Sequence, residues 1–211
     1  MTRGRRPDPP RRTTLLGGAA IGSVAVILLL GRFGAMVPIT EQYSIPFAGT
    51  IARMVADVVL LLSALVLAFG VHGESDVVGG SASGRVALVL FGARASVGVL
   101  LDAGPRLELV TDAGLAFDAI AVGATVVAAV RIGRAGVLHG LARWVLVPFA
   151  VLQAIVLCVE FVPSPGGGDV LVALDAFPIQ SVLLLLVGLA YVAQGRWSVV
   201  RRRTKLALKK R

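Results

Sequence analysis

The apolar run over residues 51–71 constrains this chain more than any other stretch. At about 1.5 Å per residue, a helix over this run is roughly 30 Å long, which matches the hydrocarbon core of a bilayer. Arg53 and Asp57 lie near its start, four residues apart. A helix therefore places them on one face, where they can neutralise each other away from water. The run predicts a transmembrane helix that carries a charged pair.

Similar runs recur along the chain. Of its 211 residues, 56% are hydrophobic and 16% are charged, whereas soluble domains carry about 25% charged residues. We therefore expect an all-α integral membrane protein, a bundle of six transmembrane helices with multi-pass topology in the cell (inner) membrane. The expected helices cover residues 15–31, 51–71, 86–101, 113–130, 144–161 and 170–194. A Pro178 kink is expected in the last of them.

The expected transmembrane domain covers residues 14–195. The two segments outside it are basic. Residues 1–13 are rich in Arg and Pro and predict a disordered tail, and residues 196–211 predict a juxtamembrane tail. A basic tail before an apolar run is also the order of a secretory signal, and Arg11-Arg12 fits a twin-arginine address. We favour an uncleaved signal anchor, because no convincing cleavage site follows. Gly18 and Gly22 give this first helix a G-x-x-x-G spacing, which permits close helix contact.

The distribution of Lys and Arg predicts the topology. If six helices span the membrane, seventeen of these residues fall on the side of the two tails and only Arg32 and Arg106 on the other side. Lys and Arg near helix ends are retained in the cytoplasm, so both termini are expected there. Trp144 and Trp197 then lie at the cytoplasmic interface, where aromatic side chains are enriched.

The net charge of +9 does not indicate a nucleic-acid-binding protein, because the excess lies in the two tails and no basic stripe with interleaved aromatic residues occurs. Basic tails beside apolar segments favour contact with anionic lipid headgroups. The residues expected to make this contact at the C-terminus are Arg201, Arg202, Arg203, Lys205, Lys209 and Lys210. Other membrane subunits or further copies of the chain are possible partners.

Several charged residues lie inside the predicted helices and form a candidate intramembrane polar site: Arg53, Asp57, Arg94, Asp118, Glu160 and Asp175. A charge at the centre of a spanning helix costs about 2.5–3.5 kcal/mol on insertion scales, so such side chains face the bundle interior and find partners. One interpretation is a set of structural ion pairs, with Asp118 the expected partner of Arg94. The other is a polar pocket that opens outward and binds a proton, a cation or a small polar ligand.

No catalytic site is expected. The chain has no H-E-x-x-H zinc motif and no P-loop, and its one cysteine, Cys158, is expected to be a packing residue. No metal or cofactor is expected. The predicted function is that of a small transporter or an accessory subunit of a membrane complex. The alternative is a purely structural partner subunit.

In size, helix number and expected topology, the chain resembles the substrate-binding membrane subunits of energy-coupling-factor vitamin transporters. The first helix of those subunits has a loose A-x-x-x-A spacing, and the nearest counterparts here are Gly18 with Gly22 and Ala19 with Ser23. This resemblance is one of architecture, so what it implies about transport is an expectation from fold analogy alone.

The charge bias yields a topology test. Reporter fusions after Gly73, Gly136 and Arg211 should report the cytoplasm, because the adjoining loops and tail are rich in Arg and Lys. Fusions after Thr40, Pro105 and Gly167 should report the opposite side. An external signal from the fusion after Gly136 would contradict six helices.

Overall fold

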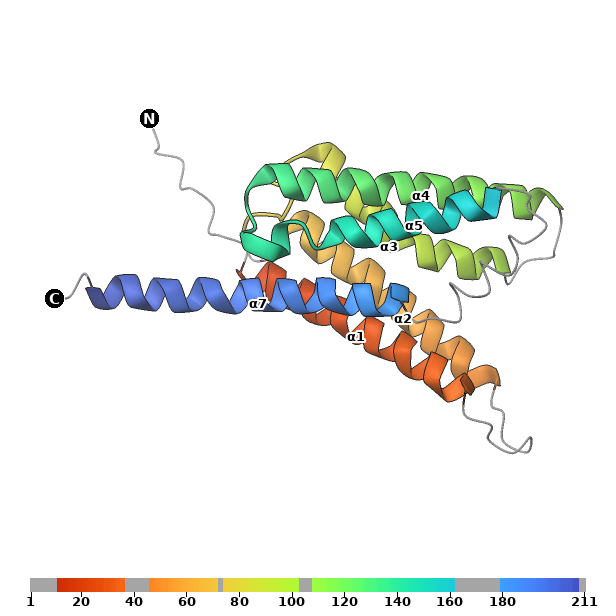
Figure 1. Cartoon of the computed structure of the whole chain (residues 1–211), viewed down its shortest axis with the longest axis horizontal. Helices are drawn as coiled ribbons and strands as arrows, with labels where there is room; N and C mark the ends of the chain where they lie inside the picture. Colours follow the sequence, from red (N-terminus) through yellow and green to blue (C-terminus); the bar gives the residue numbers. More distant parts are fainter. Residues whose placement is uncertain (1–10, 37–45, 72–73, 103–107, 162–178, 209–211) are drawn as a thin grey trace.

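The structure, a computed structural model, describes residues 11–36, 46–71, 74–102, 108–161 and 179–208 (Figure 1). This part of the chain is helical and contains no strand. Its elements are α1 (Arg11–Met36), α2 (Pro46–Phe69), α3 (Ala82–Asp102), α4 (Glu108–Ala135), the 3-10 helix η2 (Gly140–Arg143), α5 (Leu146–Phe161) and α7 (Ile179–Leu208). The predicted all-helical class is confirmed.

Five of these helices are long and apolar enough to cross a membrane: α1, α2, α4, α5 with the preceding η2, and α7. The sixth, α3, has 21 residues and is therefore about 31 Å long. It lies between α2 and α4 in the bundle. The helices therefore have the lengths that the sequence analysis expects of membrane spans.

Two helices extend into the segments that the sequence assigns to tails. Helix α1 begins at Arg11 rather than Leu15, because the Glu74 carboxylate caps its first turn. Glu74 Oε2 accepts hydrogen bonds from the Thr13 amide at 2.8 Å and the Thr13 hydroxyl at 3.0 Å. A carboxylate at this position satisfies free helix N–H groups and complements the helix dipole. At the other terminus, α7 continues without a break to Leu208.

The six helices form a closed ring. Each helix packs on the next along the chain, from α1 to α5, and α7 packs on both α5 and α1. Figure 1 shows the start of α1, η2 and the C-terminal half of α7 at the same end of the bundle. We call this the basic end, because it carries Arg12, Arg85, Arg131, Arg134, Arg143 and Arg196.

The contact between α1 and α7 is a close approach of two backbones. A Cβ atom added at Gly18 would lie 2.7 Å from Tyr191 Cβ and 2.8 Å from the amide nitrogen of Val192. One added at Gly188 would lie 2.6 Å from the amide nitrogen of Gly22. Only glycine allows this spacing. The predicted close contact at Gly18 and Gly22 is thus present, and α7 supplies the opposing glycine.

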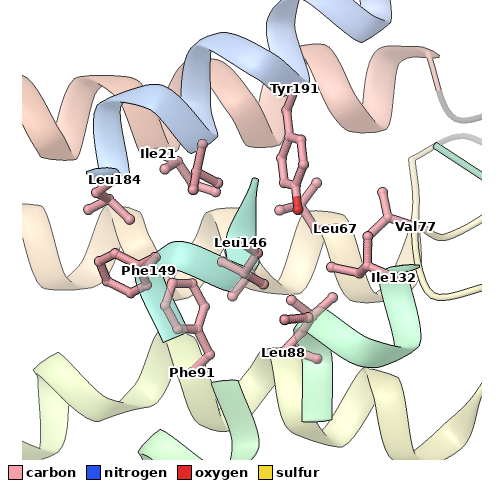
Figure 2. Packing of buried hydrophobic residues seen from close by; sticks show 14 of the residues in the cluster. Ile21, Leu67, Val77, Leu88, Phe91, Ile132, Leu146, Phe149, Leu184 and Tyr191 are labelled. Carbon is pink, nitrogen blue, oxygen red and sulfur yellow. The ribbon is translucent and has the colours of Figure 1, made fainter. Parts of the chain in front are cut away.

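The core fills the interior of the ring with side chains from every helix (Figure 2). Phe91 of α3 and Phe149 of α5 meet edge to face, with ring centroids 5.9 Å apart. On α2, three alanines on one side of the helix pack inward, since Ala56, Ala64 and Ala68 are fully buried. These contacts unite the two sides of the ring in one apolar core.

The glycine contact predicts the outcome of adding a side chain. Gly18→Leu should lower the free energy of unfolding by about 1–3 kcal/mol, because the new atoms meet backbone that cannot yield. Thermal unfolding in mild detergent measures the effect. Gly123→Leu is the matched control, since a Cβ there meets nothing within 4 Å. Equal stability of the two variants would contradict the tight contact.

Candidate functional site

A salt bridge between α3 and α4 joins two residues of the predicted polar site. Arg94 Nε of α3 donates to Asp118 Oδ1 of α4 at 2.9 Å. The side chains are 26% and 38% exposed, respectively. This pairing confirms the expectation that Asp118 is the partner of Arg94. It arises because α3 and α4 are consecutive and pack side by side.

The charged pair on α2 is arranged differently. Arg53 is exposed and Asp57 is half-buried one helical turn further along. Their opposite charges remain within electrostatic range, but neither forms a salt bridge with a described residue. Among the described acids of the predicted polar site, Asp57 is therefore the one that does not fit the interpretation of structural ion pairs.

The other predicted site residues are only partly covered. The backbone of Glu160 belongs to the last turn of α5, and the position of its side chain is not described. Asp175 lies outside the described residues, as does the kink expected at Pro178. The structure therefore joins Arg94 to Asp118 and leaves the predicted grouping of three aspartates untested.

The predicted headgroup-binding residues lie at the C-terminal end of α7. Arg201, Arg202, Arg203 and Lys205 belong to the helical part of the chain, beyond the last residue of the apolar span, Trp197. Lys209 and Lys210 lie outside the described residues. A continuous helix carries these basic positions away from the bundle at the basic end (Figure 1).

A buried polar contact between α4 and α5 was missed by the sequence analysis. Thr125 is fully buried, and its hydroxyl donates to the Ala121 carbonyl at 2.8 Å. The same hydroxyl lies 3.5 Å from Gln153 Oε1, a long and weak contact. Gln153 is also buried. A glutamine inside an apolar run is the sequence signal that would have indicated such a contact.

A second charged cluster, at the basic end, was also missed. The Asp76 side chain is only 3% exposed. Its Oδ2 accepts a hydrogen bond from Arg85 Nε at 2.8 Å and lies 2.7 Å from Arg85 Nη2. Its Oδ1 accepts the Gly80 amide at 2.7 Å. Asp76 thus holds the connection between α2 and α3 against the start of α3. The sequence shows this segment only as a polar loop, because the pairing depends on a turn at Gly79 and Gly80 with positive φ angles.

Most of the polar side chains described above form hydrogen-bonded pairs or salt bridges. Arg94 with Asp118, Arg85 with Asp76 and Glu74 with Thr13 each join two elements. Within the described ranges, no three His, Cys, Asp or Glu side chains lie together in a way that would hold a metal ion. Cys158 is exposed rather than packed, which corrects the expectation for that residue. The described cluster is therefore suited to joining helices.

A short match to a protease motif lies outside the described residues. Residues 166–169 read GGGD, which has the G-x-G-D spacing of intramembrane aspartyl proteases. Aspartyl catalysis needs two carboxylates that share a proton. A four-residue match in a proline- and glycine-rich stretch of sequence does not identify the second carboxylate, so it does not define an active site.

Comparisons with models of protein families, with curated proteins and with solved structures found no match.

The Arg94–Asp118 pair makes a quantitative prediction. Arg94→Ala should lower the free energy of unfolding by about 3 kcal/mol, the low end for breaking a buried pair, because both side chains are partly exposed. Adding Asp118→Ala should restore much of the loss, with a coupling of about 1–3 kcal/mol. Thermal unfolding of the four proteins of the cycle measures it. Arg53→Ala combined with Asp118→Ala is the control, and additive effects for Arg94 would contradict the ion pair.

Proposed function

We propose that this chain is an accessory subunit of a membrane complex, without a catalytic site. In this proposal it crosses the cell (inner) membrane six times, with both termini in the cytoplasm. The lengths and composition of the helices support membrane insertion, and the bias of Lys and Arg supports the orientation. The basic tails contact anionic headgroups on the cytoplasmic side.

The observation that carries the proposal is the Arg94–Asp118 salt bridge. It pairs Arg94, a basic residue inside a predicted span, with an aspartate of the neighbouring helix. Opposite charges paired in this way lower the cost of placing either one in an apolar environment. In this proposal the Arg94–Asp118 salt bridge stabilises the packing of α3 against α4, as the structural role of an accessory subunit requires.

A small transporter is the second candidate, and Asp57 favours it. Asp57 is half-buried in a predicted membrane span and forms no salt bridge with a described residue. A carboxyl group inside a span that has no direct basic partner is the kind of group found in proton relays of pumps and transporters. The two candidates therefore differ in whether water reaches Asp57.

Cysteine labelling separates these candidates. In a Cys158→Ala background, Asp57→Cys should stay unlabelled by a charged, membrane-impermeant thiol reagent added to intact cells, because an accessory subunit needs no water path to this position. Thr40→Cys, in the predicted outer loop, is the positive control. Val58→Cys is the lipid-facing control, since Val58 is exposed on the neighbouring face of α2.

Labelling of Asp57→Cys at the rate of Thr40→Cys would overturn the accessory-subunit proposal in favour of transport. The accessory role also requires a companion. In mild detergent the chain of 21.8 kDa should elute as a larger complex that contains a second membrane protein in fixed ratio. Elution as a single chain would contradict that role.

A further inference from the structure

An apolar groove runs along the outer surface of the bundle between α1 and α7. It has a volume of about 490 Å³ and is lined over Gly18 to Ile27 of α1 and Leu185 to Val192 of α7. The groove is open because the close approach at Gly18, Gly22 and Gly188 leaves no side chain to fill the seam. It faces away from the core, since Leu189 is 56% exposed on its rim.

The lining offers no free polar group to a ligand. Its one side-chain hydroxyl, on Ser23, already donates to the Ala20 carbonyl at 2.8 Å. The lined part of α1 is about 14 Å long, which matches one leaflet of a hydrocarbon core of about 30 Å. An occupant of the groove must therefore be apolar and about one leaflet long.

Two arginines stand above the groove at the basic end. Arg12 precedes Ala19 by seven residues on α1, and Arg196 follows Leu189 by seven on α7. Seven residues are close to two turns, so each arginine lies on the face of its helix that borders the groove. Both are exposed. They sit about 10 Å beyond those groove residues, beside Trp197, an exposed side chain of the type that marks a membrane interface.

We propose that this surface binds one anionic phospholipid, with an acyl chain in the α1–α7 groove and its phosphate between Arg12 and Arg196. The apolar groove matches the acyl chain of such a lipid, and the two arginines match its phosphate. The arginines also lie beyond the end of the groove, as a headgroup lies beyond the hydrocarbon of its leaflet. The inference deepens the proposed headgroup contact, and it rests on the proposed orientation in the membrane.

A helix of a second copy fits this groove less well than an acyl chain. An acyl chain can lie along the whole apolar groove, whereas a helix about 10 Å wide could place only one row of its side chains in it. The exposed side chains of Val26 and Leu189 on its borders also keep a second backbone at a distance. The two arginines, moreover, call for a negative charge at the same end.

Native mass spectrometry of the full chain, titrated with phosphatidylglycerol or phosphatidylcholine in mild detergent, tests the proposal. We expect one phosphatidylglycerol to bind more tightly than phosphatidylcholine. Arg12→Gln with Arg196→Gln should weaken phosphatidylglycerol binding roughly 30-fold, from about 1 kcal/mol per arginine, and should leave phosphatidylcholine binding unchanged. Gly22→Leu should weaken the binding of both lipids, because its side chain enters the groove.

Matched variants control for charge and for fold. Arg131→Gln with Arg134→Gln removes two exposed arginines from the same end on α4. Gly123→Leu adds the same side chain at an exposed glycine, where a Cβ meets nothing within 4 Å, as is also the case at Gly22. Both controls should bind phosphatidylglycerol within about twofold of the unmodified chain, as expected for positions outside the site.

Three results would overturn the proposal. The first is equal binding of the two lipids by the unmodified chain, and the second is a loss in the α4 control as large as that in the Arg12 and Arg196 variant. The third is a dimer that Gly22→Leu converts to a monomer, which would assign the groove to a second copy. Each is independent of whether the chain acts as an accessory subunit, which cysteine labelling and complex size report separately.

Discussion

The backbone contact between α1 and α7 is the constraint on which the architecture depends. Gly18, Gly22 and Gly188 bring two helices together more closely than side chains would allow. In lipid, helices gain little from hydrophobic association, so contact of this kind and interhelical hydrogen bonds must hold a bundle together. Because α7 touches α5 over a much smaller surface than it touches α1, the ring closes mainly at this seam.

Polar contacts also join the helices and loops of the bundle. Glu74 ties the loop after α2 to the first turn of α1, and Asp76 ties the same loop to α3 through Arg85. Both ties lie at the basic end, while the Arg94–Asp118 pair joins α3 to α4 further along the bundle. Each join uses a charged group that would be costly to leave alone in an apolar environment. These polar contacts are therefore spread over several neighbouring segments of the bundle.

The sequence predicts this fold well wherever the signal is local. Long apolar runs locate the helices, and a charged residue inside such a run needs a partner, which led to the pairing of Arg94 with Asp118. The spacing of Gly18 and Gly22 indicated a close contact, although it did not identify Gly188 as the opposite side. The helix ends were less predictable. The start of α1 depends on Glu74, a residue 61 positions away from Thr13, and no pattern near Arg11 reveals it.

The candidate site was predictable only in part for the same reason. An embedded Arg or Asp is visible in a sequence, but whether Asp57 is closed by a partner depends on how the helices pack. The Asp76–Arg85 pair needs a turn with two glycines at positive φ, and its residues looked like an ordinary polar loop. Exposure of Cys158 likewise follows from the orientation of α5, which apolar composition on all sides of a helix does not specify.

The contact between α1 and α7 also joins two helices that are synthesised at different times. At about 5–20 residues per second, roughly 10–30 s separate the synthesis of Gly22 from that of Gly188. During this interval the glycine face of α1 has no α7 to pack against. The nascent chain therefore passes through a stage in which this surface, adapted for close helix contact, is not yet covered by α7.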